Sequence, residues 1–404
     1  MPILTSRPLR GGTRAPFVLL VAMTACGTLG MHVIIPALPA MAAALDMSIS
    51  SAQLTITLYL IGLAIGQLVY GPISDRFGRR PVVLAGLTLF TVASFITALA
   101  RTPSLLIGAR IMQSVGGCAG LVLGRAAVRD GAAADKAAAQ LALLTLVMSM
   151  VPAIAPAIGG FLTSWYGWRA SFVLLTAIGG LTLLACLFWL PETRAPTTAS
   201  RSMLSGYARL LRSRRFLGYA IGGACSTTAF YGFMSASPFI FERQLNQSPE
   251  RIGLYYLVLM GGVALGSFSA NRVAGRLSMQ AALRIANLIG LAGATAFALA
   301  DLTGNLSVFS VVASVVVFMI GAGMASPFAL AGSVSVNPQA IGAASGLYGF
   351  VQMGYGMLCT IVAETWSPGA VYPVATILVG SALLGQIAMT IAVRAEARRE
   401  RTGA

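Results

Sequence analysis

The chain has 404 residues, of which 57% are hydrophobic and only 9% are charged, and its mean hydropathy is +0.83. A soluble protein carries about a quarter charged residues, so this composition excludes an ordinary soluble protein. The apolar residues lie in blocks of about 20, the length that a helix needs to cross ~30 Å of hydrocarbon. The ~10-residue alternating segments that are typical of a β-barrel are not evident. The sequence therefore predicts an all-α polytopic membrane protein.

Twelve such blocks predict twelve transmembrane helices, six on each side of a basic linker. The predicted units are a half at 1–191, the linker at 192–215 and a half at 216–404. Six plus six spans is how many secondary transporters are built, with the substrate site between the halves near the bilayer midplane. The predicted spans lie near residues 16–39, 51–71, 82–100, 104–126, 138–162, 170–190, 216–241, 252–270, 281–300, 306–327, 340–364 and 370–393.

The net charge of +16 is distributed unevenly across the predicted topology. Of the 27 Lys and Arg residues, Arg110 lies inside a span, four lie at one side, and the other 22 lie in or beside the loops of the opposite side. Basic loops face the cytoplasm, so both termini and the linker are predicted to be cytoplasmic. The basicity is thus a topology signal, and no nucleic-acid partner is expected.

The first span contains His32, the only histidine of the chain, within the stretch "GMHVIIPALP". An ionisable side chain inside a membrane span is a candidate functional group by default. A single buried histidine is also often a packing residue, and the sequence leaves both interpretations open.

The turn after the second span carries the stretch "GPISDRFGRRP", in which one acid stands among three arginines. Its glycines are expected to allow tight turns and close helix approach, and its prolines to mark span ends. The eleventh span begins on the same side, near residue 340, and a helix N-terminus carries about half a positive charge. Asp75 is therefore predicted to cap that helix and latch the halves together; alternatively, the turn only fixes topology. The residues of this predicted cytoplasmic gate are Gly71, Asp75, Arg76, Gly78, Arg79 and Arg80.

The fourth and fifth spans each carry an unusual feature. Arg110 is a permanent charge near the outer end of the fourth span, either a functional group or an arginine whose side chain reaches up to the interface. In the fifth span, Pro152 and Pro156 are expected to bend the helix, while Gly159 and Gly160 let a neighbouring helix come close. These four residues predict a hinge or a seal, with simple packing as the alternative.

Three of these stretches resemble motifs of the major facilitator superfamily. The stretch "GPISDRFGRRP" resembles the signature between its second and third helices, and "RIMQSVGGCAG" (110–120) resembles its helix 4 motif. The stretch "PAIAPAIGG" (152–160) resembles the helix 5 motif of its drug:proton antiporters. With "PALP" in the first span and "AVRD" after the fourth, the chain is similar to the bicyclomycin and chloramphenicol resistance branch over almost its whole length.

The resemblance implies the major facilitator fold and the export of small amphiphilic drugs in exchange for protons by alternating access. The proton gradient would stand in place of a cofactor, and a monomer is expected. Proton-coupled transport of a metabolite, such as an amino acid or a sugar, is the alternative; a membrane receptor or scaffold that transports nothing is a more remote one. The sequence carries no catalytic constellation and no pattern of metal ligands, so an enzyme is not expected.

The first span departs from the pattern of this branch. Four residues before the first proline of "PALP" the branch usually has an acid, which pairs with the helix 4 arginine, and here that residue is His32. At 1.5 Å of helix per residue, His32 and Arg110 are both expected ~10 Å below the outer boundary. The resemblance thus implies that His32 and Arg110 form the proton-coupling site, but the substitution puts the inherited mechanism in doubt. Ala155 is a milder departure, since a glycine usually precedes the second proline there.

Seven further side chains at span depth are polar or aromatic and are candidates for the wall of a substrate cavity. Apolar, aromatic walls with few polar groups suit a lipophilic drug, although each residue alone is also compatible with packing. They are Tyr59, Gln67, Gln113, Phe230, Tyr231, Gln352 and Tyr355.

Overall fold

The computed structural model describes residues 15–131, 134–193, 203–336 and 341–402, which are mostly helical and contain no β-strand. The N-terminal half consists of α1 (Phe17–His32), the 3-10 helix η1 (Ile35–Ala37), α2 (Leu38–Ala44), α3 (Ile49–Phe77), α4 (Arg79–Ala98), α5 (Pro103–Gly131), α6 (Ala134–Tyr166) and α7 (Arg169–Trp189). The linker and C-terminal half consist of α8 (Met203–Leu211), α9 (Arg214–Thr228), α10 (Phe230–Phe239), η2 (Ile240–Gln244), α11 (Pro249–Val273), α12 (Met279–Leu302), α13 (Val308–Ser335), α14 (Ile341–Trp366) and α15 (Val371–Thr402).

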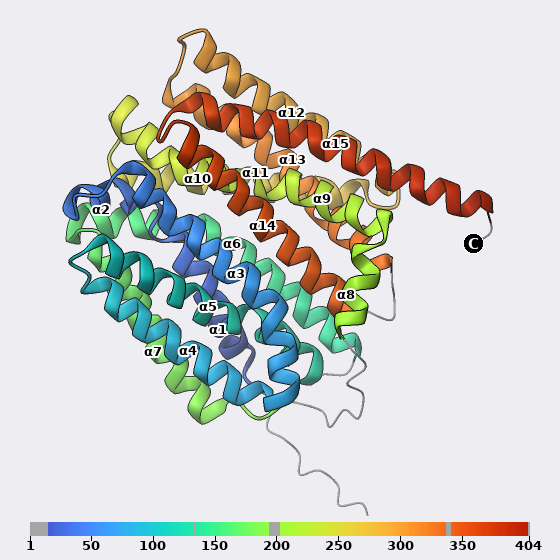
Figure 1. Cartoon of the computed structure of the whole chain (residues 1–404), viewed down its shortest axis with the longest axis horizontal. Coiled ribbons are helices and arrows are strands. Elements are labelled where there is room, and N and C mark those ends of the chain that lie inside the picture. Colours follow the sequence, from blue (N-terminus) through green and yellow to red (C-terminus); the bar gives the residue numbers. More distant parts are fainter. Residues whose placement is uncertain (1–14, 132–133, 194–202, 337–340, 403–404) are drawn as a thin grey trace, which may run out of the picture.

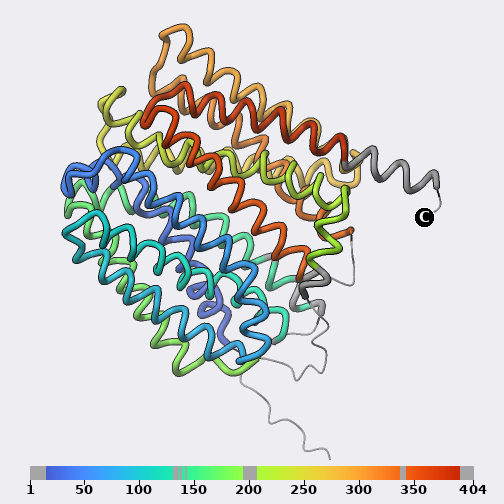
Figure 2. Tube along the Cα trace, in the orientation of Figure 1, coloured from blue at the N-terminus to red at the C-terminus, as the bar shows by residue number. Residues whose placement is uncertain are grey.

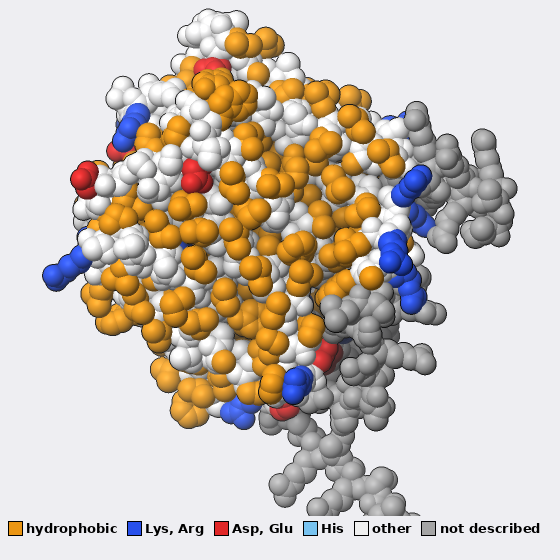
Figure 3. Space-filling model, in the orientation of Figure 1, with side chains coloured by type: hydrophobic (Ala, Val, Ile, Leu, Met, Phe, Trp, Pro, Cys, Tyr) orange, Lys and Arg blue, Asp and Glu red, His pale blue; other side chains and the backbone are white. Residues whose placement is uncertain are grey.

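Eleven stretches of the described residues are long and apolar enough to cross a membrane. They account for every predicted span except the seventh, which consists of α9 followed directly by α10. Large apolar side chains are exposed over the outside of the bundle. Figure 3 shows one such face, which is hydrophobic over most of its area and carries its charges near the edges. The chain is therefore an all-α, multi-pass membrane protein, as predicted.

α1 ends at His32 because Pro36 follows four residues later. Proline has no N–H, so the His32 carbonyl loses its helical partner, and the proline ring crowds that carbonyl. The chain continues as η1 and then α2, with Pro36 and Pro39 in their first turns, where a missing donor costs little. The first predicted span is thus a broken helix, and His32 lies at the break.

The seventh span is interrupted at Ala229, between α9 and α10. The hydroxyls of Thr227 and Thr228, just before the break, donate to backbone carbonyls four residues back. Such hydrogen bonds bend helices. Interrupted helices often mark the substrate sites of transporters, so this break is a place to look for one.

The turn between α3 and α4 is shorter than predicted. α3 continues to Phe77 with Pro72 inside it, so Gly71 is helical, and nothing lies within 4 Å of the position where its side chain would begin. The expectation that Gly71 makes a turn or a close helix contact is therefore wrong, because the helix extends beyond the apolar block that set the predicted boundary. Gly78 makes the turn, with a φ of +96° that favours glycine.

Glycines bring the helices within each half into backbone contact. A Cβ atom on Gly27 of α1 would come 2.7 Å from the carbonyl oxygen of Gly117 on α5. A Cβ atom on Gly321 of α13 would come 2.6 Å from the backbone nitrogen of Gly290 on α12. Small residues of this kind allow close helix packing in membranes, where no hydrophobic effect drives the helices together.

The two halves lie side by side, with the N-terminal helices blue to green and the C-terminal helices yellow to red (Figures 1 and 2). Two helix pairs form most of the contact between them, α3 with α14 and α6 with α11, and α10 and α11 also approach α2, α3 and η1. We call the end with the α3–α4 turn, the α11–α12 turn and α8 the basic end, because most arginines of the described connections lie there. The opposite end, with the connections 45–48 and 367–370, is called the far end.

Candidate functional site

Arg110 of α5 is completely buried among the helices of the N-terminal half. Its Nη1 donates to the carbonyl of Gly30 on α1, 2.8 Å away, and to Oε1 of Gln113 one turn along α5. Its guanidinium lies 4.2 Å from the ring centre of Tyr59 and 5.9 Å from that of Phe172. Cation–π contacts and two neutral acceptors stabilise this charge only in part.

No carboxylate forms an ion pair with Arg110 among the described residues, and its Nε and Nη2 have no hydrogen-bond partner there. A buried charge that lacks an ionic partner is costly, and ionisable groups inside membranes are generally kept for function. The complete burial of the guanidinium does not fit an arginine that reaches up to the membrane interface.

His32 is also buried, with 5% of its surface exposed, but it does not meet Arg110. Its Nδ1 lies 2.8 Å from the carbonyl of Thr28, so Nδ1 carries the hydrogen of the neutral ring. Arg110 instead contacts the backbone of Gly30, and at 3.6 residues per turn His32 points about 200° away around α1. No hydrogen bond or ring contact between the two side chains occurs among the described residues. The two side chains of the predicted pair do not contact each other: His32 belongs to α1, and Arg110 of α5 contacts α1 at the Gly30 carbonyl.

Two of the predicted cavity residues take part in the packing of Arg110. Tyr59 is fully buried and donates its hydroxyl hydrogen to the carbonyl of Gly27, 2.8 Å away. Gln113 is fully buried as well, and its Nε2 donates to Oγ of Ser94 at 2.6 Å. Both side chains fix the groups that surround the guanidinium, and neither faces the space between the halves in this conformation.

The polar candidates of the C-terminal half, Gln352 and Tyr355, both lie on α14 and form hydrogen bonds to α9 and α15. Gln352 of α14 donates from Nε2 to Oγ1 of Thr227, 2.9 Å away. Tyr355, one turn further, has its hydroxyl 2.7 Å from Oγ of Ser381 on α15. Both glutamine and tyrosine are half-buried, so they remain partly accessible.

The remaining candidates are aromatic or lie between the halves. Phe230 stacks on Phe233 with ring centres 5.6 Å apart, and Tyr231 packs over the Gly356 backbone of α14. The Gln67 side chain of α3 packs directly against the backbone of α14 at Gly349, because glycine has no side chain there. These residues bring an apolar, aromatic lining and a few amide groups to the junction of the two halves.

The predicted hinge or seal on α6 lies against α11 at the far end. The Pro249 carbonyl of α11 occupies the place where a side chain on Gly160 would begin. In return, a Cβ atom on Gly253 of α11 would come 2.5 Å from the Pro156 carbonyl. Gly159, one residue earlier, faces the Val33 carbonyl at the break of the first span. The two halves therefore meet here backbone to backbone.

The face of α6 that packs against α11 is buried at the far end and exposed nearer the basic end. Thr145, Ser149, Pro156 and Thr163 share one face, since their spacing follows the helical repeat. Pro156 and Thr163 are buried, whereas Thr145 and Ser149, nearer the basic end, are exposed. The opposite face of α6 is also exposed there, as Met150 shows. The junction of α6 and α11 is thus closed at the far end and accessible toward the basic end; Pro152, with intermediate exposure, lies between.

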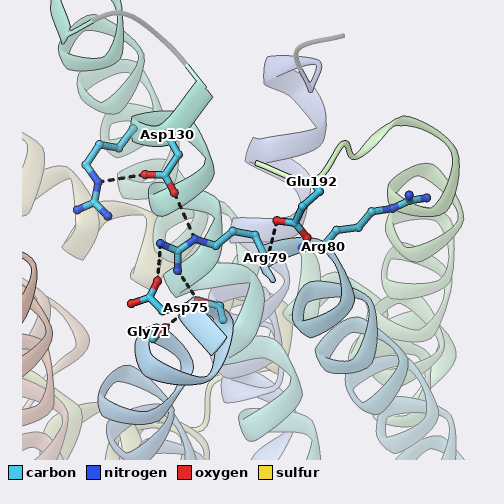
Figure 4. Close-up of polar contacts among 8 residues, drawn as sticks. Gly71, Asp75, Arg79, Arg80, Asp130 and Glu192 are labelled. Carbon is cyan, nitrogen blue, oxygen red and sulfur yellow. Dashed lines mark hydrogen bonds and ion pairs between the residues drawn. The ribbon is translucent and has the colours of Figure 1, made fainter. Parts of the chain in front are cut away.

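Arg79 forms the centre of a charged cluster at the basic end (Figure 4). Its guanidinium pairs with Asp75 of α3 at 2.9 Å and with Asp130 of α5 at 3.2 Å, and it also donates to Oγ of Ser74. Arg129 approaches the other oxygen of Asp130 at 3.5 Å. The cluster ties α3, α4 and α5 together within the N-terminal half.

Glu192 completes this cluster from the segment after α7 (Figure 4). Its carboxylate accepts hydrogen bonds from the backbone N–H groups of Arg79 at 2.9 Å and Arg80 at 3.2 Å. These are the first N–H groups of α4, which have no partner within the helix, and a carboxylate there also meets the positive end of the helix dipole. Glu192 was predicted to belong to the linker, and its capping role was not predicted, although an acid directly after a span is a signal for it. Arg76 lies over the neighbouring Phe77 ring, 5.3 Å from its centre.

The linker helix α8 approaches the basic end of both halves. Burial, and to a smaller degree the nearby Asp75 carboxylate, raise the pKa of Tyr207 on α8. The Tyr207 hydroxyl would lie 3.8 Å from a Cβ atom on Gly346 of α14. The predicted contact of Asp75 with the start of the eleventh span involves residues 337–340, which lie outside the described part of the chain, so the latch stays a prediction.

A polar contact joins α3 and α14 at the far end. Oε2 of Glu364 lies 3.1 Å from Oγ1 of Thr57, and Ser50 donates to the Glu364 backbone carbonyl at 3.2 Å. Glu364 is 8% exposed; from its position near the end of its span it was predicted to be an outer-edge acid, and a proton carrier only if His32 is not one. Only the structure shows that its side chain turns into the junction of the halves.

A family model described as Major Facilitator Superfamily matches residues 20–360 of the chain. The chain belongs to the major facilitator superfamily. This superfamily member is similar to multidrug resistance protein D of Escherichia coli (strain K12), with 29% identity over 86% of this chain and 88% of the relative. It is also similar to a chloramphenicol resistance protein of Pseudomonas aeruginosa, with 31% identity over 78% of this chain and 75% of the relative.

Among solved structures, the transporter is similar to a bacterial homologue of the human lysosomal transporter Spinster in an inward-facing and unoccupied conformation. The TM-score is 0.72 at 16% identity, and the match covers 94% of this chain and 96% of that one. At this identity the likeness concerns the fold alone. The resemblance to the superfamily that the motifs indicated is confirmed.

Proposed function

We propose that this transporter exports small amphiphilic drugs in exchange for protons, by alternating access to one space between its halves. Two relatives that match three quarters or more of its length are named for multidrug and chloramphenicol resistance. The observation that carries the proposal is the junction of α6 and α11, which Gly160 and Gly253 close at the far end and which is exposed toward the basic end. A space that is open to one side at a time is what alternating access requires.

The basic end is proposed to be the cytoplasmic face of a bacterial inner membrane, with both termini on that side, because arginines gather there. The accessible space then receives drug from the cytoplasm. Its aromatic residues Phe230, Tyr231 and Tyr355, with the amide of Gln352, suit a lipophilic compound that carries a few polar groups. The protein is proposed to act as a monomer among membrane lipids, with the proton gradient and no cofactor.

His32 and Arg110 are proposed to couple export to protons through α1 rather than by direct contact. Arg110 donates to the carbonyl of Gly30, which lies two residues before His32, where α1 ends. A proton on the His32 ring adds a second cation within the same turn of α1. Repulsion between the two cations then favours movement of that helix end.

Drug accumulation in an efflux-deficient host tests this function across a panel of antibiotic classes. Expression of the chain is expected to lower the accumulation of at least one lipophilic antibiotic, and a protonophore is expected to abolish the difference. A reduction that survives collapse of the proton gradient contradicts proton coupling. Unchanged accumulation of every class tested contradicts drug export and favours a metabolite as substrate.

A further inference from the structure

The contact between α3 and α14 at the far end contains a buried carboxylate. Glu364 lies two residues before the end of α14 and is 8% exposed. Helical side chains lean toward the N-terminus of their helix, so this carboxylate points from the far end toward the middle of the bundle. There it meets Thr57, which stands on α3 in the other half.

Two threonines extend this contact into a chain of hydrogen bonds. Oγ1 of Thr57 lies 2.8 Å from Oγ1 of Thr360, and the Thr360 hydroxyl donates to the carbonyl of Met357 at 2.7 Å. A hydroxyl has a single hydrogen, so Thr360, which uses its own, accepts from Thr57. Thr57 also has one hydrogen and cannot donate to Thr360 and to Glu364 together.

The protonation state of Glu364 therefore decides how many of these bonds exist. An ionised carboxylate only accepts, so the two hydroxyl hydrogens serve three contacts, and one of Glu364–Thr57, Thr57–Thr360 and Thr360–Met357 lacks a hydrogen. A protonated carboxyl donates to Thr57, which donates to Thr360, which donates to the Met357 carbonyl. Each of the three contacts then holds one hydrogen, and the closed junction of α3 and α14 is more stable.

The surroundings of Glu364 provide no cation to hold it ionised. No Lys, Arg or His pairs with it among the described residues, and charged residues are absent from 49–66 of α3, from α10 and α13, and from 371–390 of α15. Arginines of α8 and α9 lie at the basic end. The charged groups nearest along the chain are Asp46 before α3 and Glu242 and Arg243 of η2. Asp75 and Arg76 of α3 also lie at the basic end. The titratable side chains without a charge at neutral pH on α14 and the described helices packed against it are Tyr59, Tyr70, Cys225, Tyr207, Tyr219, Tyr231, Tyr348, Tyr355, Cys359 and Tyr372.

We propose that Glu364 is a proton-binding site that controls the far-end gate: a proton taken up from the outside stabilises the closed α3–α14 contact, and its loss allows the contact to open. The inference rests on the proposed proton exchange and on the far end facing outward. After drug leaves to the outside, protonation of Glu364 closes that side and returns the empty transporter to the form open at the basic end. The proton-binding acid then stands in the C-terminal half, while the first span carries His32.

A pair of labels across the far end tests this assignment in the full-length protein in liposomes. Ala44 and Thr365 are exposed on opposite halves, and the five native cysteines are buried, so cysteines introduced at these two positions are the reactive ones. Acidification is expected to shift the label distance of the parent toward the short, closed population. Glu364→Gln, whose amide donates as a protonated acid does, is expected to stay closed at every pH. Asp46→Asn, which alters an exposed acid at the same end, is expected to keep the parent's response.

Thr57→Val removes the hydroxyl at nearly constant shape and is expected to lose the closing response to acid. A pH response that persists in Glu364→Gln, or a Thr57→Val variant that responds as the parent does, overturns the assignment. The distance measurement requires no drug, so it is separate from the export assay. Export that ignores the proton gradient, together with an intact gate response, contradicts proton exchange and leaves the Glu364 gate standing.

Discussion

Two arginines, Arg79 and Arg110, are the centres of two polar clusters in the N-terminal half, and the clusters are built in opposite ways. Arg79 lies at the basic end, with two carboxylates and a serine hydroxyl around its guanidinium. Arg110 lies inside the bundle, with one carbonyl, one amide oxygen and aromatic rings around it, and two of its nitrogens have no partner among the described residues.

This difference in partners is the one expected between a charge with a structural role, at Arg79, and a charge kept for function, as proposed for Arg110. At Arg79 the opposite charges compensate one another, and the cluster joins three helices, which is what a structural cluster does. At Arg110 the charge is left uncompensated in the place where it costs most. Such a group destabilises the fold, which supports the coupling role proposed for Arg110. The following variants test whether this contrast holds.

The largest effect is expected for Arg110→Met, which replaces the charge with an apolar side chain of similar length. Export should be lost, because the coupling group is gone. The thermal stability of the purified protein should be unchanged or higher, since replacing buried ionic groups by apolar ones is often neutral or stabilising by ~1–4 kcal/mol. Drug accumulation and thermal unfolding in detergent measure the two outcomes. A marked fall in stability would show that Arg110 is a packing residue.

The next effect concerns His32 and separates coupling from drug binding. His32→Ala is expected to abolish proton-driven export and leave drug binding largely intact. His32→Asp restores the acid that this branch usually has, and it is expected to retain export with a shifted pH optimum. Drug-induced proton release from proteoliposomes across a pH series measures both. Parent-like exchange in His32→Ala would make His32 a packing residue and leave Glu364 as the principal proton site.

A smaller and opposite effect is expected for Arg79→Met, which removes the cation that Asp75 and Asp130 share. Because the Arg79 side chain is only 11% exposed, the free energy of unfolding should fall by about 1–3 kcal/mol. Arg129→Met is the matched control: its side chain is 56% exposed and contacts the same Asp130, so its effect should be near zero. Equal losses in the two variants would refute the structural role of the cluster.

The smallest effect is expected for Asp75→Asn. Its pair with Arg79 spans one helical turn and the Asp75 side chain is 41% exposed, so the pair contributes about 0.3–0.5 kcal/mol. Stability should therefore barely change. Faster labelling of cysteines at the basic end and slower export would support the predicted latch to the eleventh span. Labelling and turnover identical to the parent's would leave the turn with a topological role.

Much of the fold was predictable because helix number in a membrane follows from apolar length. Ten of the twelve predicted spans correspond to single continuous helices, and the prolines near His32 account for the break in the first span. The interruption of the seventh span was missed, since it depends on threonine hydroxyls that bond their own backbone. The extension of α3 to Phe77 was missed too, because its last turns are polar and carry no hydropathy signal.

The candidate site was less predictable than the fold. Burial of Arg110 and the close approach of Gly160 follow from residue type and position. The acceptor that a buried donor finds does not follow from residue type and position. Arg110 donates to the Gly30 carbonyl, although a carbonyl is present at every residue of α1. Glu364 was predicted to be an outer-edge acid and only a reserve proton carrier, because sequence position sets the depth of a Cα atom, whereas the direction of a long side chain sets the depth of its charge.

The glycine contacts within each half limit the positions at which this protein can accept substitutions. At Gly27 and Gly321 even one added methyl group meets the backbone of the next helix, so these positions tolerate almost no change. Aromatic residues at the junction of the halves, such as Tyr231, face fewer constraints of this kind. A mutational library selected for resistance to new compounds should therefore collect its changes in that lining, while the glycine-packed interiors stay fixed. New substrate ranges then arise without redesign of the scaffold that moves.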